Sequence, residues 1–147
     1  MAGFVETTFD KFIFTVKVGY LYTDDDYWVD IRGAVATVGV TDYLQKSHGD
    51  VAFVKPVAPG MEVKKGEDLG EIETIKVTIN LISPVTGRVS EINQELETHP
   101  ELINSDPYGA GWICRIELAD PEGTKDGFLQ AEAYMELMKG KREREAG

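Results

Sequence analysis

The chain alternates apolar and polar positions over many short stretches, and Gly, Pro, Asp or Asn residues separate one stretch from the next. A period of two is typical of strands that bury one face, and the separating residues are those that favour turns. Strands are therefore expected at 12–18, 27–31, 34–40, 50–54, 61–63, 69–75, 77–82, 88–92 and 112–118. So many short strands joined by tight turns predict a mainly β sandwich or barrel.

Three stretches carry helix signals instead. Thr41 suits an N-cap and Gly49 suits the position after the last turn, so a short helix fits between them. Apolar residues recur at three- and four-residue spacing over 126–139, which predicts a C-terminal helix that Gly140 ends. A single helical turn is expected at 99–103. Helices are thus a minor part of the predicted fold.

The two ends of the chain differ from its middle. Residues 1–19 contain a partly alternating aromatic stretch, which predicts an N-terminal strand or a docked arm. Residues 140–147 alternate basic and acidic side chains, which predicts a solvated tail. The run Asp24, Asp25 and Asp26 is expected to form a turn with all three charges facing solvent.

One lysine, Lys76, lies between two apolar, β-prone arms at 69–75 and 77–82. This arrangement predicts a lysine presented at the tip of a β-hairpin. The segments 57–66 and 82–92 on either side of it resemble each other weakly, each with a Pro, a Gly and then a Val-containing strand. From spacing alone, an ordinary solvated lysine is a better explanation of the pattern than a modified one.

The composition and net charge limit the classes of molecule that the chain is expected to bind. The 147 residues form one domain with a net charge of −11, which argues against nucleic acid or an anionic membrane surface and favours basic protein partners. No apolar run approaches the roughly 18 residues of a membrane span, and the first residues lack the pattern of a signal peptide. A cytoplasmic location is expected.

No residue set in the sequence predicts catalysis or metal binding. Cys114 is a single cysteine inside a strand pattern, so it is interpreted as a small buried apolar residue that cannot form an internal disulfide. His48 and His99 are far apart in sequence and lack the spacing of a zinc site. The chain is therefore expected to be a carrier or binding protein rather than an enzyme.

A series of motifs in a fixed order gives a more specific signal. They are Trp28-Val29, Val38-Gly39-Val40-Thr41-Asp42, Gly49-Asp50-Val51-Ala52-Phe53-Val54, Gly60, Glu73-Thr74-Ile75-Lys76, Ser83-Pro84-Val85-Thr86-Gly87, Pro100-Glu101-Leu102-Ile103-Asn104, Asp106-Pro107-Tyr108 and Gly111-Trp112. In this order they resemble the H protein family of the glycine cleavage system over roughly residues 20–138. The resemblance places a lipoyl-carrier domain at 20–139.

The resemblance implies a lipoyl- or biotinyl-type hammerhead of two antiparallel sheets, with a C-terminal α-helix and short helices. It implies that Lys76 carries lipoic acid in amide linkage, and that Gly60, Glu73 and Gly87 guide the lipoate-attaching enzyme. Such an arm carries a group and reducing equivalents between enzymes, one of them dihydrolipoamide dehydrogenase, while the protein supplies the tether.

The chain departs from the family pattern around the expected arm cleft. Tyr27 and Asn80 stand where the family usually has acidic residues, and Ser47 with His48 stands where some members have a histidine. In the family those carboxylates lie near a cleft that shelters a cationic aminomethyl group. Their replacement favours an H-like lipoate-binding protein that works with a heterodisulfide-reductase-like complex in sulfur oxidation.

Three alternatives stay open at this stage. The first is a glycine cleavage H protein that serves glycine decarboxylase and the aminomethyltransferase. The second is an unmodified H-like binding scaffold. The third is a carrier in another complex, although a biotinyl carrier usually has methionines beside its lysine, whereas here Ile75 and Val77 flank Lys76.

Overall fold

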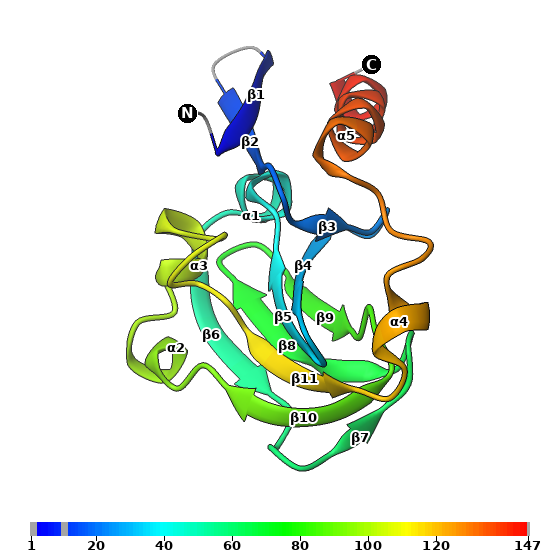
Figure 1. Cartoon of the computed structure of the whole chain (residues 1–147). Helices are drawn as coiled ribbons and strands as arrows, with labels where there is room; N and C mark the ends of the chain where they lie inside the picture. The colour runs from blue at the N-terminus through cyan, green and yellow to red at the C-terminus, as the bar shows by residue number, and fades with distance from the viewer. Residues whose placement is uncertain (1–2, 10–11, 147) are drawn as a thin grey trace.

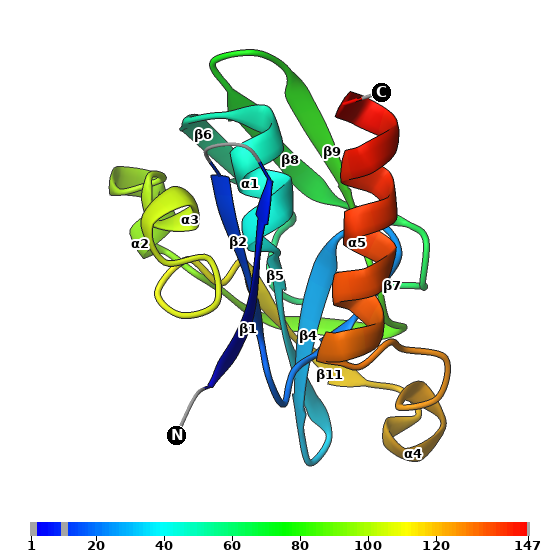
Figure 2. The same cartoon turned by 90° about the horizontal axis from the view of Figure 1, so that it is seen from above.

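The computed structural model describes residues 3–9 and 12–146, which form three antiparallel sheets and five helices (Figures 1 and 2). The strands are β1 (Phe4–Phe9), β2 (Phe12–Lys17), β3 (Leu21–Tyr22), β4 (Tyr27–Arg32), β5 (Val35–Val40), β6 (Val51–Pro56), β7 (Glu62–Val63), β8 (Asp68–Thr74), β9 (Thr78–Ile82), β10 (Gly87–Ile92) and β11 (Cys114–Leu118). The helices are α1 (Asp42–His48), α2 (Glu95–Thr98), α3 (Leu102–Ser105), α4 (Pro121–Thr124) and α5 (Ala131–Ala146). The mainly β prediction is confirmed.

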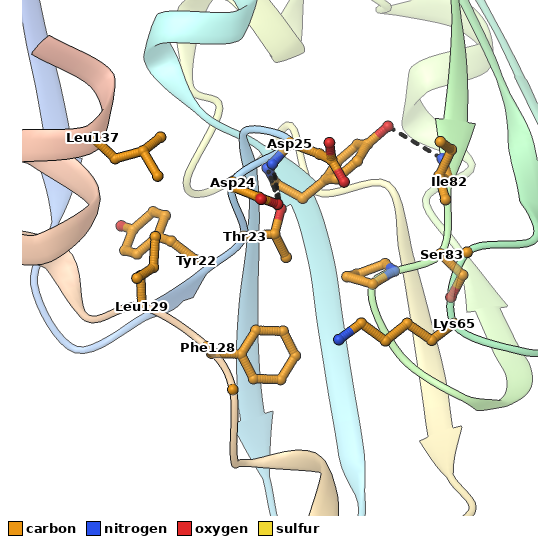
Figure 3. A pocket seen from close by; sticks show the side chains of 14 residues that line it. Tyr22, Thr23, Asp24, Asp25, Lys65, Ile82, Ser83, Phe128, Leu129 and Leu137 are labelled. Carbon is orange, nitrogen blue, oxygen red and sulfur yellow. Dashed lines mark hydrogen bonds between the residues drawn. The ribbon is translucent and has the colours of Figure 1, made fainter. Parts of the chain in front are cut away.

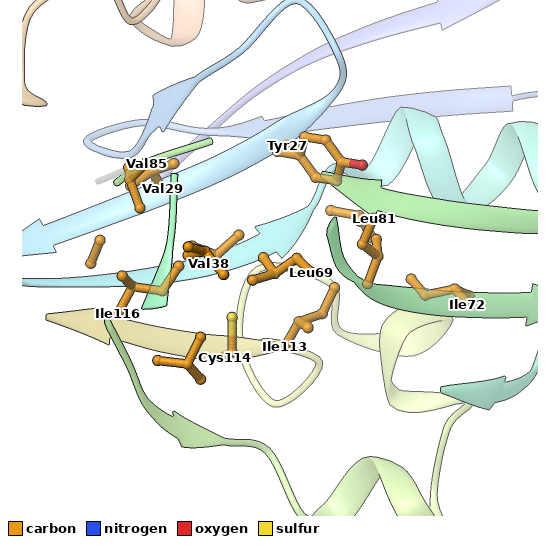
Figure 4. Close-up of a cluster of buried hydrophobic side chains, with 14 of the residues drawn as sticks. Tyr27, Val29, Val38, Leu69, Ile72, Leu81, Val85, Ile113, Cys114 and Ile116 are labelled. Atoms are coloured by element: carbon orange, nitrogen blue, oxygen red, sulfur yellow. The ribbon is translucent and has the colours of Figure 1, made fainter. Parts of the chain in front are cut away.

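Two sheets form the body of the molecule. The larger has the order β3-β4-β5-β11-β10-β7, and the smaller has the order β6-β8-β9. Their facing sides enclose the main core, in which Val29, Val38, Ile72, Leu81 and Ile116 are all buried (Figure 4). Burying these β-branched and aliphatic side chains removes apolar surface from water and holds the two sheets together. Cys114 belongs to this core, as expected.

A second, aromatic core lies between the N-terminal hairpin β1–β2, α1 and α5. Phe14, Tyr22, Trp28 and Tyr134 are each 2% exposed or less within it. The Tyr22 and Tyr134 rings stack with their centroids 4.8 Å apart. The region expected to form an N-terminal strand or arm is thus a two-stranded hairpin that packs against α1 and α5 (Figure 2).

Most predicted strands and the first helix lie where the sequence placed them. Thr41 caps α1 by accepting a hydrogen bond from the Leu44 amide at 3.3 Å, and Gly49 follows the helix with φ of 86°. Helix α3 starts later than the turn predicted at 99–103, and both α2 and α4 were missed. Helices of one turn bury too few apolar residues to leave a periodic pattern.

The limits predicted for the C-terminal helix were wrong. Helix α5 begins at Ala131 and continues through Gly140 to Ala146, so the residues expected to form a solvated tail are helical within the described range. One glycine costs a helix interior only about 1 kcal/mol, which the packing of Met138 and the contacts of Lys141 offset.

Among the described residues, no helix is both long and apolar enough to cross a membrane.

Candidate functional site

Lys76 lies at the tip of the β8–β9 hairpin, as the sequence predicts, in a turn fixed by Thr74. The Thr74 amide donates to the Val77 carbonyl at 2.8 Å, and its hydroxyl accepts from the amides of Lys76 and Val77 at 3.2 and 3.0 Å. The Ile75 amide donates to the Asp50 carbonyl at 3.0 Å, which attaches the tip to the start of β6. The backbone of the tip is therefore well ordered, while its side chains project from it.

The Lys76 side chain is suited to acylation. It is exposed, and it takes part in none of the ion pairs found among the described residues. Its stem lies near Gly49, where an added methyl would lie 3.7 Å from Lys76 Cε. Forming an amide removes the lysine charge without breaking an ion pair, so lipoic acid fits this position.

Glu73 lies three residues before Lys76 on the solvent face of the smaller sheet. It is opposite Phe53 of β6 and Thr78 of β9. Its carboxylate is 3.7 Å from Lys55 Nζ, and both side chains are more than one third exposed. An ion pair this exposed contributes little to stability, so Glu73 remains accessible to a partner.

Gly60 and Gly87 lie by the larger sheet, away from the lysine-bearing hairpin. The Gly60 amide donates to the Val89 carbonyl at 2.7 Å, and its φ of 94° favours glycine. Gly87 pairs with β7 and β11, and a Cβ there would lie 2.1 Å from the Glu117 carbonyl oxygen. Backbone conformation at Gly60 and close backbone packing at Gly87 therefore explain why glycine occupies these two positions. Neither explanation depends on an attaching enzyme.

Tyr27 connects the two sheets at the inner end of β9. Its hydroxyl accepts from the Ile82 amide at 3.1 Å and makes a longer contact of 3.5 Å to the Asn80 carbonyl. The ring is 5% exposed, and burial raises the pKa of the phenol. The Asn80 side chain is exposed and lies opposite Glu71 on the solvent face. Of the expected cleft residues, Tyr27 is therefore buried between the sheets, whereas the Asn80 side chain lies at a shallow hollow on the solvent face.

A pocket of about 400 Å³ opens beside Tyr27 (Figure 3). Asp24 and Asp25 lie on one side, while Lys65 projects from the other with its Nζ 5.9 Å from the centre of the Phe128 ring. The remaining lining residues are Tyr22, Thr23, Gly66, Ile82, Ser83, Pro84, Gly127, Leu129 and Leu137. The pocket thus combines an apolar floor with two carboxylates and one ammonium group.

Tyr27 brings no charge to the pocket, and Asn80 is not among the residues that line it, but two carboxylates reach it from another position. Asp24 and Asp25 lie in the turn before β4, and both line the pocket with Tyr27. The aspartate run was visible in the sequence, but only a turn was predicted from it, not a part in a pocket. Lys65 and Phe128 were missed because they reach the pocket from distant segments, which no local pattern connects.

Asp26 departs from the solvent-facing position expected for it. Its Oδ1 accepts from the Tyr134 hydroxyl at 2.8 Å, and its Oδ2 is 3.1 Å from Lys141 Nζ. The Tyr134 hydroxyl also lies 2.8 Å from Thr41 Oγ1, and Lys141 donates to the Asp24 carbonyl. Burial raises the pKa of Asp26, whereas Tyr134 and Lys141 act in the opposite direction. Helix α5 thereby braces the turn that carries the pocket carboxylates.

Ser47 and His48 do not line this pocket. His48 Nδ1 lies 2.9 Å from the Leu44 carbonyl at the end of α1, so the ring caps its own helix. Ser47 Oγ is buried and has no hydrogen-bond partner among the described residues. Because α1 ends beside Ile75 and Lys76, both residues belong to the surroundings of the hairpin tip rather than to the pocket.

The described part of the chain contains no group of His, Cys, Asp and Glu side chains able to hold a metal ion. Burial raises the pKa of the Cys114 thiol to about 12, so this cysteine stays protonated and unreactive near neutral pH. The chemistry of the site is thus centred on the presented lysine and the pocket.

Comparison with known proteins identifies the family. The family model described as glycine cleavage H-protein matches residues 20–141. The chain is 39% identical to a probable glycine cleavage system H protein of Aeropyrum pernix over 88% of this chain and 90% of that protein. It is 44% identical to the glycine cleavage system H protein of Thermotoga maritima over 79% of this chain and 93% of that protein.

A solved structure agrees with these sequence matches. The crystal structure of a glycine cleavage system H protein from Mycobacterium marinum superposes with a TM-score of 0.73 at 33% identity, covering 81% of this chain and 95% of that one. These comparisons do not support the prediction that favoured a carrier of sulfur oxidation. The chain belongs to the glycine cleavage H-protein family, whose members are carriers with lipoic acid covalently attached to a lysine.

Proposed function

We propose that this chain is a glycine cleavage carrier that bears lipoic acid on Lys76. It takes an aminomethyl group from glycine decarboxylase and delivers it to the aminomethyltransferase, and dihydrolipoamide dehydrogenase then reoxidises the arm. The observation that carries the proposal is an exposed lysine at a fixed hairpin tip, which makes no ion pair with the described residues, on a body whose pocket contains two carboxylates. The names of the related proteins point to the same pathway.

The charge of the pocket favours an aminomethyl cargo. An amine is cationic near neutral pH, so Asp24 and Asp25 stabilise it, whereas an anionic sulfur compound would be repelled. Lys65 lies across the pocket and reduces the negative potential without cancelling both carboxylates. The cargo therefore fits the pocket even though Tyr27, which lines it, is uncharged.

Each part of the pocket has a role for a loaded arm. When bound, lipoic acid supplies a disulfide that accepts the group and two electrons and is later reoxidised. Phe128 and Leu129 offer apolar surface to the arm, and Tyr27 holds the end of β9 in place through the Ile82 amide.

The proposal is tested by lipoylating the purified protein and mixing it with glycine decarboxylase and glycine. We expect release of CO₂ with the wild type and none with Lys76→Arg, whose intact mass should lack the lipoyl group. The double variant Asp24→Asn with Asp25→Asn should load about tenfold more slowly, because the cation loses its partners.

Glu143→Gln is the matched control, since it removes one exposed carboxylate on α5 outside the pocket. Its loading rate should equal that of the wild type. A lipoylated wild type that releases no CO₂ would overturn the pathway. Unchanged loading in the double aspartate variant would contradict the role of the pocket.

A further inference from the structure

The solvent face of the smaller sheet carries an exposed aromatic side chain. Phe53 of β6 is 62% exposed, although it lies in the middle of a strand. The two residues that flank the lysine are also exposed, Ile75 at 71% and Val77 at 47%. An apolar group that remains in water this close to a modified residue indicates a surface that a partner covers.

The position of Phe53 relative to the lysine is set by strand register. Phe53 is directly opposite Glu73, which is three residues before Lys76. Opposed Cα atoms lie about 5 Å apart and three residues span at most about 11 Å, so Phe53 is within roughly 16 Å of Lys76. This distance is well inside the footprint of an ordinary protein interface.

The same face is acidic. Glu71 and Glu73 lie on it with Lys55, and Asp68 lies with Glu71 around a shallow hollow next to β9. Three carboxylates against one ammonium group leave the face with a net negative charge. Its complement is a partner with an apolar pocket bordered by Lys or Arg side chains.

The length of the lysine side chain indicates which partner this is. An enzyme that attaches lipoic acid must bring its active site to Nζ itself, so its surface must lie against the hairpin and the face beside it. Enzymes that act later react with the far end of a long arm, so their surfaces need not contact the protein next to Lys76. The surface next to Lys76 is thus needed most during attachment.

We propose that Phe53 is an anchor for the lipoate-attaching enzyme, which receives it in an apolar pocket bordered by basic side chains. This inference rests on the attachment of lipoic acid to Lys76. In that step the Lys76 amine attacks the acyl carbon of an activated lipoyl adenylate, and an amide bond forms. AMP is the leaving group and takes the electrons of the broken acyl–oxygen bond, and the nitrogen releases a proton.

The test measures attachment by intact mass, with purified lipoate–protein ligase, lipoate and ATP, over a range of carrier concentrations. Phe53→Ala should raise the KM for the carrier about tenfold and leave kcat within about twofold, because the anchor acts in binding. Phe53→Leu, which keeps an apolar side chain, should recover part of the loss. Glu71→Gln should raise KM less, and added salt should reduce its effect.

Ile13→Ala is the matched control, since Ile13 is 51% exposed but lies on the N-terminal hairpin. It should leave attachment unchanged. Once lipoylated by long incubation, Phe53→Ala should load with glycine decarboxylase at the wild-type rate. Attachment to Phe53→Ala at the wild-type KM would overturn the inference, whereas a wild type that acquires no lipoyl mass would overturn the proposed function instead.

Discussion

Asp26 shows how a single side chain departs from its sequence context. It follows two exposed aspartates, yet it turns inward with φ of 71° and binds Tyr134 and Lys141. Aspartate tolerates this left-handed region better than most residues because its short side chain can hydrogen-bond locally. The outcome depends on partners more than 100 positions away, so no local rule distinguishes Asp26 from Asp24 or Asp25.

The raised pKa of Asp26 predicts a dependence of stability on pH. The folded state holds this proton more tightly than the unfolded chain, in which the pKa is about 3.9. The free energy of unfolding contributed by Asp26 therefore falls as pH rises from about 4 through the folded pKa, and is constant above it. Urea unfolding of wild type and Asp26→Asn from pH 3.5 to 7 should show this as a declining difference. A difference in free energy of unfolding between the two proteins that stays constant over this pH range would contradict the prediction.

Helix α5 shows what periodicity predicts for an element and what it does not. The buried residues Ala131, Tyr134, Met135 and Met138 follow the three- and four-residue spacing seen in the sequence. The limits were wrong because Gly140 was interpreted as a stop signal, although the helix passes through it. Tertiary contacts beyond Gly140, such as that of Lys141 with Asp26, maintain the last turns.

This explanation predicts that Gly140→Ala stabilises the protein. Alanine is about 1 kcal/mol more favourable than glycine in a helix interior. A Cβ at this position would meet only the flexible end of Arg144 at 3.4 Å. Chemical denaturation should show a gain of up to about 1 kcal/mol, and Gly127→Ala, at φ of 88°, should show a loss. A loss for Gly140→Ala would place the end of the helix at this residue.

The hairpin around Lys76 was predictable, whereas the pocket was not. Two apolar arms beside a polar centre are a local pattern, and the structure forms them as β8 and β9. The pocket is built from the β3–β4 turn, the segment at 65–66, the end of β9 with the two residues after it, the segment at 127–129 and Leu137 of α5. These segments lie far apart along the chain, so no local sequence pattern shows that they meet.

At the scale of the whole molecule, the N-terminal hairpin precedes the part of the chain that the family model matches, which is residues 20–141. Side chains from the matched part bind backbone groups of β2. Asp42 accepts from the Thr15 amide at 3.0 Å, and the Tyr108 and Tyr22 hydroxyls donate to the Thr15 and Lys17 carbonyls at 2.6 Å. The hairpin therefore closes the aromatic core.

Removal of residues 1–19 should lower the free energy of unfolding by about 3–6 kcal/mol, because Phe14 and Val16 are both buried. Attachment of lipoic acid should persist, since Lys76 belongs to a different sheet. Thermal and urea unfolding measure the first effect, and intact mass measures the second. Phe4→Ala, at a residue 43% exposed, is the control and should cost far less. Equal stability with and without the hairpin would show that it does not belong to the core.

The hydrogen bonds of Thr74 at the hairpin tip have a consequence for the rates at which partners meet the arm. A fixed turn makes the Cα of Lys76 a stationary pivot, so all of the motion belongs to the rotatable bonds beyond it. The arm then samples one sphere around that pivot, and its concentration at any docked active site is set by the radius of this sphere. A more mobile tip would enlarge the volume that the arm samples, and would therefore lower the effective concentration of the arm at every docked active site. The hydroxyl of one threonine thus helps to set how often each enzyme encounters its substrate.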